Sequence, residues 1–204
     1  MATTLDDIRA GVRLRLGLNS SDPALTDADL LIFVNAAITQ LDNLRNWWWN
    51  EADDTITTAD GTSLYAFFAD SRKTQHLSIG DDTIKFRTKL DLIKYKSDSG
   101  RPRFWTVESG QYRLYPTPDD VYTVDVVYQA EPTALASGSD TVVWPDWAAD
   151  AIVLTAAQLA AAKTVPDRVQ DIAIELGRVM QGLLDDSLPT VTSAMPARRD
   201  DWTA

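Results

Sequence analysis

The stretch Arg103–Tyr128, RFWTVESGQYRLYPTPDDVYTVDVVY, constrains the fold most, because it reads as successive β-strands. Side chains alternate in character on both sides of Ser109-Gly110, a dipeptide typical of a turn. Prolines and aspartates at Pro116–Asp120 interrupt the alternation, and β-branched residues resume at Val121. No catalytic constellation lies here. The stretch therefore predicts a packed β-meander that presents surface, which favours assembly over chemistry.

Both ends of the chain have helical periodicity instead. Thr4 and Thr26 each precede an acidic first turn and an apolar stripe, which predicts helices from Thr4 to Gly17 and from Asp27 to about Arg45. An alanine-rich third helix begins at Pro145, and a fourth runs from Asp167 to about Leu184. Between the two pairs of helices we also expect β-hairpins at 55–67 and 77–87, a short helix at 90–95 and a short strand at 141–144.

Together these patterns predict an α+β fold. We expect a four-helix bundle built from both chain ends, with an inserted antiparallel β-domain and an extended C-terminal tail. The expected units are an N-terminal helical hairpin at 1–50, the antiparallel β-domain at 51–144, a helical pair at 145–186 that packs on the hairpin, and the tail at 187–204.

Charge is distributed unevenly along the chain. The net charge is −11, with −7 over residues 1–70, +2 over residues 71–130 and −6 over residues 131–204. Because an acidic protein repels phosphates, we expect DNA to pass beside it without being bound. No apolar run reaches the length of a membrane span, and the acidic N-terminus lacks signal-peptide features. We therefore expect a cytosol-like compartment, or a particle assembled there, and no membrane contact.

Residues that carry catalysis or bind metals are scarce. The chain has one histidine, His76, and no cysteine. Metal-ligand spacings, Gly-rich phosphate loops and nucleophile motifs are missing from the sequence. Pairs of adjacent aspartates fall at predicted turns, helix caps or surface positions. We therefore expect no enzymatic activity, no metal and no cofactor.

Three consecutive tryptophans, Trp47, Trp48 and Trp49, follow the second predicted helix. Adjacent side chains point in different directions, so the three indoles cannot share one face. Two interpretations stay open. The indoles pack at the junction of helix and sheet, or one or two of them anchor an interface, since tryptophan is enriched in interaction hot spots. Stacking on a sugar is a third use.

Basic residues gather in the predicted β-region. They form either a solvated face of the sheet or a contact surface for an acidic neighbour, such as the helices of an identical copy in a ring. The candidate inter-subunit or tail interface therefore includes, beside the three tryptophans, Arg87, Lys89, Arg101 and Arg103.

The last residues, from Ser187 onwards, have two prolines and no periodicity, which is typical of an extended segment. They nevertheless contain Arg198, Arg199 and Trp202. An aromatic residue beside arginines suits a segment that orders on binding a partner. The alternative is that Trp202 is an incidental hydrophobic residue.

In its order of parts, the chain resembles the head-to-tail adaptor proteins of tailed bacteriophages. The resemblance covers nearly the whole length and rests on packing and turn residues. The matching segments are, in order, Phe33–Ala37 (FVNAA) in the second helix, the tryptophan junction, Thr57–Gly61 with Tyr65, Gly110–Pro118 (GQYRLYPTP), Tyr122–Tyr128 and Pro132.

The resemblance implies a structural virion protein at the neck, assembled in the host cytoplasm. Such adaptors form a homo-oligomeric ring, usually twelve-fold, that docks under the portal protein, extends the DNA channel and provides the attachment site for tail or nozzle proteins. DNA passes through the channel without specific binding. The C-terminal tail reaches the portal in such proteins, which makes Met195, Arg198, Arg199 and Trp202 candidate portal-binding residues.

Two other functions are weighed against this one. Another tail-completion or nozzle component of the neck would differ only in its partner, so the sequence separates the two poorly. A glycan-binding module would act as a monomer through the tryptophan-rich surface.

Overall fold

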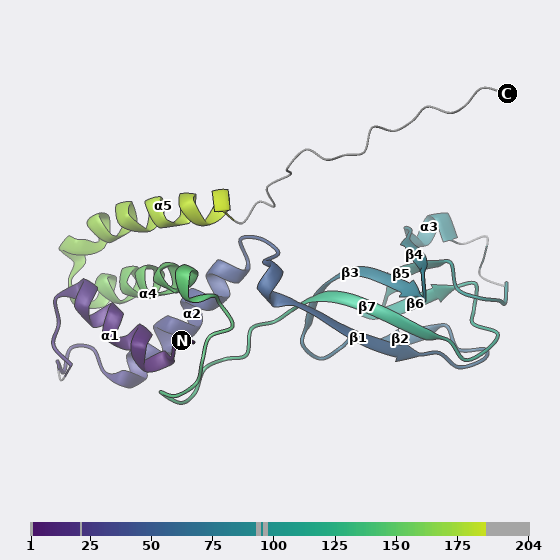
Figure 1. The fold of residues 1–204 in the computed structure, drawn as a ribbon, viewed down its shortest axis with the longest axis horizontal. Helices are drawn as coiled ribbons and strands as arrows, with labels where there is room; N and C mark the ends of the chain where they lie inside the picture. The colour runs from purple at the N-terminus through teal and green to yellow at the C-terminus, as the bar shows by residue number, and fades with distance from the viewer. Residues whose placement is uncertain (1, 21, 93–94, 96–97, 187–204) are drawn as a thin grey trace, which may run out of the picture.

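The structure is a computed structural model that describes residues 2–20, 22–92, 95 and 98–186. It contains a helical half and a sheet half (Figure 1). The helices are α1 (Leu5–Leu16), α2 (Asp27–Asp42), α3 (Lys89–Leu92), α4 (Ala149–Thr164) and α5 (Val169–Asp186). The strands are β1 (Glu51–Thr57), β2 (Leu64–Ala66), β3 (Ser71–Ile79), β4 (Asp82–Phe86), β5 (Phe104–Glu108), β6 (Gln111–Tyr115) and β7 (Thr123–Ala130).

Local sequence explains where the first two helices begin. The Thr4 and Thr26 hydroxyls each accept the backbone N–H three residues on, and the Asp7 and Asp29 carboxylates accept the N–H of their N-cap threonine. These capping boxes satisfy backbone donors that a helix start leaves without partners. At the other end of α1, Gly17 adopts a left-handed conformation with φ 71°, which glycine tolerates at little cost.

Helix α4 is the centre of the helical half. It packs against α1, α2 and α5, whereas α5 packs on α4 and on the short turn that connects them. Ten of its residues are buried, and they lie on all sides of the helix. Many are alanines, whose small side chains let neighbouring helices approach closely. The apolar residues on the inner side of α5 cover the remaining face of α4.

The sheet has the order β1-β7-β3-β4-β5-β6-β2. Two hairpins follow the local turn sequences: Gly80-Asp81 joins β3 to β4, and Ser109-Gly110 joins β5 to β6. Both residues of the second turn have positive φ, 53° and 72°, as a tight hairpin requires. The sheet curls around its apolar face, where a second core forms that is separate from the helical core.

The predicted four-helix bundle with an antiparallel β-domain is wrong in two respects. Within the described residues there are five α-helices rather than four, and α5 packs mainly on α4, from which it adds to the core that α1, α2 and α4 share. The sheet is mixed, because β4 and β5 run parallel, with Lys85 opposite Phe104 and Phe86 opposite Trp105. Connecting residues that include α3 separate these two strands and allow the parallel crossover. The predicted tail, 187–204, lies outside the described residues.

Pairing of the first strand also differs from the expected hairpin at 55–67. Strand β1 pairs antiparallel with β7, and β2 pairs with β6. Their intervening loop therefore crosses from one edge of the sheet to the other. As a result, the chain enters the sheet on β1 and leaves it on the adjacent β7, with Glu51 opposite Gln129.

Candidate interaction surfaces

Four tryptophans form one cluster between the helices and the sheet. The Trp47 and Trp49 rings stack at 4.7 Å between centroids, and Trp144 lies tilted against both, at 5.3 and 4.9 Å. Trp147 meets Trp49 edge-on at 6.0 Å. Trp47, Trp49 and Trp144 are buried in the helical core. The cluster thus fixes the path of the chain where it leaves α2 for the sheet.

Trp48 lies differently from its two neighbours. It is 64% exposed and stands edge-on to Trp49, with 5.4 Å between ring centroids. Trp147, on the other side of Trp49, is 53% exposed. Among the described tryptophans, a partner can reach these two indoles, because Trp47, Trp49, Trp105 and Trp144 are buried. A role of Trp47, Trp48 or Trp49 in an interface stays a prediction.

A buried carboxylate lies beside the tryptophans. Asp42 is 1% exposed, and its Oδ1 accepts hydrogen bonds from Asn50 Nδ2 at 2.8 Å and from Trp144 Nε1 at 3.1 Å. Its Oδ2 is buried without a hydrogen bond within the described part of the chain. Burial raises the pKa of Asp42, although the two hydrogen bonds and the nearby Arg72 act in the opposite direction.

Arg72 connects the sheet to the same place. From the start of β3, its guanidinium donates to the Asp42 backbone carbonyl at 2.5 Å and, less closely, to that of Arg45 at 3.5 Å. A cation at a helix C-terminus satisfies free carbonyls and interacts favourably with the helix dipole. The junction is therefore held by aromatic packing, a buried carboxylate and this arginine. In the sequence, this junction could have been predicted from Asp42, an acidic residue on the apolar stripe of α2.

The predicted basic residues divide into paired and unpaired side chains. Lys89 pairs with Glu108, and Arg101 pairs with Asp82 at 3.0 Å while donating to the Ile79 carbonyl. Arg87 and Arg103 are exposed, and neither side chain has an ion pair or hydrogen bond within the described residues.

The structure brings three of these basic residues to one place. Two hollows of about 340 and 440 Å³ share Phe104 in their walls, with Arg87 lining the first and Arg101 and Arg103 the second. Lys89 lines neither hollow and pairs with Glu108, the last residue of β5. The two unpaired arginines and these hollows make this end of β4 and β5 the basic surface of the sheet, suited to an acidic partner.

An exposed apolar group next to this basic surface was not foreseen from the sequence. Phe86 at the end of β4, Leu90 in α3 and Val107 in β5 are all exposed. Phe86 meets the buried Trp105 edge-on at 4.9 Å, so it extends the inner core of the sheet to the surface. The exposure of Leu90 could not be predicted from the sequence, because a helix as short as α3 has no apolar periodicity.

The remaining predictions concern the tail, metals and membranes. Met195, Arg198, Arg199 and Trp202 lie outside the described residues, so their role in portal binding stays a prediction. Among the residues that are described, no group of three or more histidine, cysteine, aspartate or glutamate side chains is placed to hold a metal ion. In that same part of the chain, no helix is long and apolar enough to cross a membrane.

Comparison with known proteins agrees with the resemblance seen in the sequence. No curated protein matches the chain. A protein-family model described as SU10 adaptor protein matches residues 3–203, which is nearly the full length and includes both the helical half and the sheet. The chain therefore belongs to the SU10 adaptor protein family, a family of phage head-to-tail adaptors.

Proposed function

We propose that the protein is one subunit of a ring, expected to be twelve-fold, at the neck of a tailed-phage virion. The ring docks under the portal, extends the DNA channel and gives the tail or nozzle its attachment site. The observation that carries this proposal is the family match over residues 3–203. The function is structural, and we propose no catalytic step for it.

Charge complementarity supports a ring of identical subunits. Arg87 and Arg103 leave the sheet with two unpaired cations at its basic surface, while both chain ends are acidic. Asp167 and Asp171, at the start of α5, are exposed and form no ion pair within the described residues. A basic sheet meeting the acidic helices of the next copy is a head-to-tail contact, the kind that closes into a ring.

The acidic balance also suits a channel. A wall of negative charge repels DNA phosphates, so the duplex slides past rather than binding. In this proposal the tail of each subunit contacts the portal through Met195, Arg198, Arg199 and Trp202. Arginines and tryptophan are enriched at interaction hot spots, and these four residues belong to a segment without helical periodicity.

Co-sedimentation with the cognate portal ring tests the proposal. Wild-type protein is compared with a variant carrying Arg198→Ala, Arg199→Ala and Trp202→Ala. We expect wild-type protein to sediment at about one copy per portal subunit. The triple variant is expected to bind at least about tenfold more weakly, since loss of one hot-spot residue costs about 2 kcal/mol.

A control variant carries Arg168→Ala and Arg178→Ala, which removes two exposed arginines from the described surface. It is expected to bind the portal ring like wild type. If the control and the tail variant lose binding equally, the tail assignment is wrong. If wild-type protein does not sediment with the portal ring, the neck assignment fails, and another tail-completion or nozzle component becomes the better proposal.

Glycan binding is the less favoured alternative. Trp48 and Trp147, the exposed indoles, each meet Trp49 edge-on, at 78° and 87° between ring planes. The family match over residues 3–203 favours an adaptor over a glycan-binding module.

A further inference from the structure

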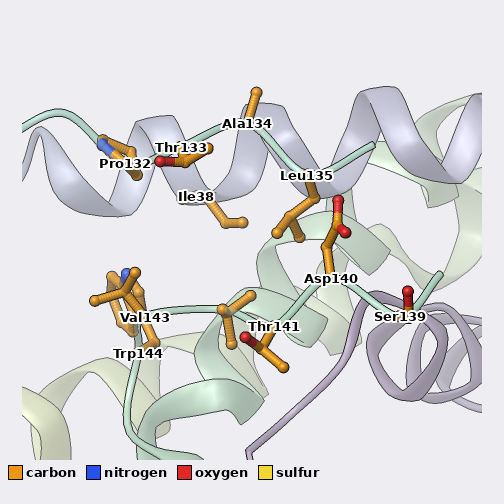
Figure 2. Close-up of a pocket in the computed structure, with 11 residues that line it drawn as sticks. Ile38, Pro132, Thr133, Ala134, Leu135, Ser139, Asp140, Thr141, Val143 and Trp144 are labelled. Atoms are coloured by element: carbon orange, nitrogen blue, oxygen red, sulfur yellow. The ribbon is translucent and has the colours of Figure 1, made fainter. Parts of the chain in front are cut away.

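A slot lies between two parts of the connection that leads from the sheet to α4. Residues 132–135 form one wall and residues 139–144 the other, and Ile38 of α2 lies between them (Figure 2). Its volume is about 480 Å³, within the range of known ligand sites. Asn35 fixes the first wall to α2, because its side-chain amide exchanges two hydrogen bonds with the Leu135 backbone, at 2.9 and 3.0 Å.

The second wall presents unpaired backbone groups. The Asp140 carbonyl and the Val142 N–H bond to the N-terminal segment, at 2.9 and 3.1 Å. Backbone groups of successive residues in an extended chain point to opposite sides. The N–H and C=O of Thr141 therefore point away from the N-terminal segment. The backbone N–H and C=O groups of Thr141 and Val143 make no hydrogen bond within the described residues. Such an edge can pair with an added strand.

Lining chemistry distinguishes this slot from the other hollows. Its one charged residue is Asp140, whose carboxylate already accepts the Ala136 and Ser137 N–H groups at 2.8 and 2.9 Å. Four other hollows on the described surface each have at least two charged lining residues. An uncharged, extended segment therefore suits this slot better than the other hollows, because fewer charged groups lose their hydration when it binds.

We propose that the slot binds residues Thr190–Ala194 of a second copy of the chain as an added strand. This inference rests on the proposed ring, because the donor is a neighbouring subunit. The segment TVTSA is uncharged, contains three β-branched residues and is bounded by Pro189 and proline at 196. β-branched residues favour extended pairing, and flanking prolines limit the length of the added strand.

The position of α5 favours a second copy over the same chain. Helix α5 packs on one side of α4, and α2, which lies at the slot, packs on another. Figure 1 shows α5 and the 131–144 connection on opposite sides of the helical half. Two helix layers are about 16–20 Å across, since packed axes lie 8–10 Å apart. The four residue steps from the end of α5 to Thr190 span at most about 14 Å, too short to bring Thr190 across.

The arrangement leaves the proposed portal contacts free. Residues that follow the docked strand begin at Met195, so Arg198, Arg199 and Trp202 emerge from the neighbouring subunit rather than from their own. Each tail would then hold the next subunit before it reaches the portal.

Site-specific photo-crosslinking of the full chain tests the inference. The chain has no cysteine, so Val191→Cys places a photoreactive label at one position. Labelled protein is mixed with unlabelled ¹⁵N-enriched protein, both free in solution and bound to the portal ring. We expect crosslinks from residue 191 to residues 132–135 and 139–144, in peptide pairs that combine the two isotopes.

Two substitutions in the same connection provide the comparison. Ala134→Trp fills the slot and is expected to reduce these crosslinks about tenfold or more, as loss of 1.4 kcal/mol would. Ala136 is exposed and does not line the slot, so Ala136→Trp is expected to leave the crosslinks unchanged. Crosslinks to other surfaces, pairs of one isotope alone, an equal effect of both substitutions, or no crosslink in either sample would each overturn the inference. Portal binding of wild type, measured separately, shows whether the proposed function itself stands.

Discussion

Asp42 illustrates at the level of one residue how the junction is built and what it costs. The carboxylate ends α2 inside the tryptophan cluster, where it orients Asn50 and Trp144. Removing a charge from water is unfavourable, and one of its oxygens has no hydrogen bond to offset that cost. The residue therefore specifies the geometry of the junction more than it stabilises the fold.

The pH dependence of stability is expected to change in Asp42→Asn. A carboxyl whose pKa is raised by folding stabilises the folded state, and this stabilisation is complete below its unfolded-state pKa of about 3.9. That contribution is lost as the pH rises through the folded-state value. Asparagine keeps an oxygen acceptor but does not ionise. Relative to wild type, the free energy of unfolding of Asp42→Asn should therefore increase from pH 3.5 to pH 7, measured by urea denaturation.

Asp42→Ala provides the comparison, because it removes the acceptor as well as the charge. It leaves the Asn50 and Trp144 donors buried without a partner, so we expect a loss of about 1–3 kcal/mol at low pH. A difference between Asp42→Asn and wild type that is constant with pH would contradict the assigned burial of charge.

The tryptophans show how far residue-level prediction reaches. Adjacency established that Trp47, Trp48 and Trp49 point in different directions, but it does not say which indole is exposed. That choice depends on Trp144, nearly one hundred positions later, which lies tilted against the two buried rings. The second helix was predicted to run to about Arg45, yet α2 ends at Asp42, and Leu44 beyond its end is exposed.

Among the helices and strands, α1 and α4 approach each other closely at Gly11 of α1. A Cβ added at Gly11 would lie 3.1 Å from Val153 Cγ1. Gly11→Leu is therefore expected to destabilise the protein by about 1–3 kcal/mol through overpacking, measured as a lower urea midpoint with an unchanged slope.

Two further variants separate overpacking from other effects of leucine. Val153→Ala combined with Gly11→Leu should recover part of the loss, because it makes room at the same contact. Gly177→Leu is the matched control: it lies on α5 with nothing within 4 Å of an added Cβ, so helix propensity should make it neutral or stabilising. No recovery in the double variant would exclude this contact as the cause.

Which strands and helices could be foreseen depends on how local their determinants are. The hairpins at Gly80 and Ser109-Gly110 and the helix starts at Thr4 and Thr26 follow from a few neighbouring residues. The pairing of β1 with β7 joins residues about 70 positions apart, and the parallel β4–β5 contact depends on how the intervening segment packs. Such pairings depend on tertiary packing, which the local alternation of side chains does not specify.

For the whole molecule, the basic surface of the sheet is the feature most directly linked to assembly. Arg103→Glu reverses an exposed charge that has no partner within the described residues, so the free energy of unfolding should change by less than about 0.5 kcal/mol. Assembly on the portal ring, counted by electron microscopy, should fall at least about tenfold at low salt, and wild-type assembly should weaken as salt is added.

Lys73→Glu makes the same charge reversal on β3, away from the hollows around Phe104. It is expected to assemble like wild type. Equal loss of assembly in both variants would point to net charge rather than to this surface, and no loss in Arg103→Glu would rule the surface out as a subunit contact.

Because the chain enters the sheet on β1 and leaves it on β7, the two crossing points are paired neighbours, about 5 Å apart between Glu51 and Gln129. The sheet is therefore joined to the helices at one place, where Arg72 of β3 also contacts the end of α2. Strands can be lengthened, shortened or exchanged away from that place without moving the ends of α2 and α4. Evolution can then refit one half of the subunit to a new partner while the other half keeps its own.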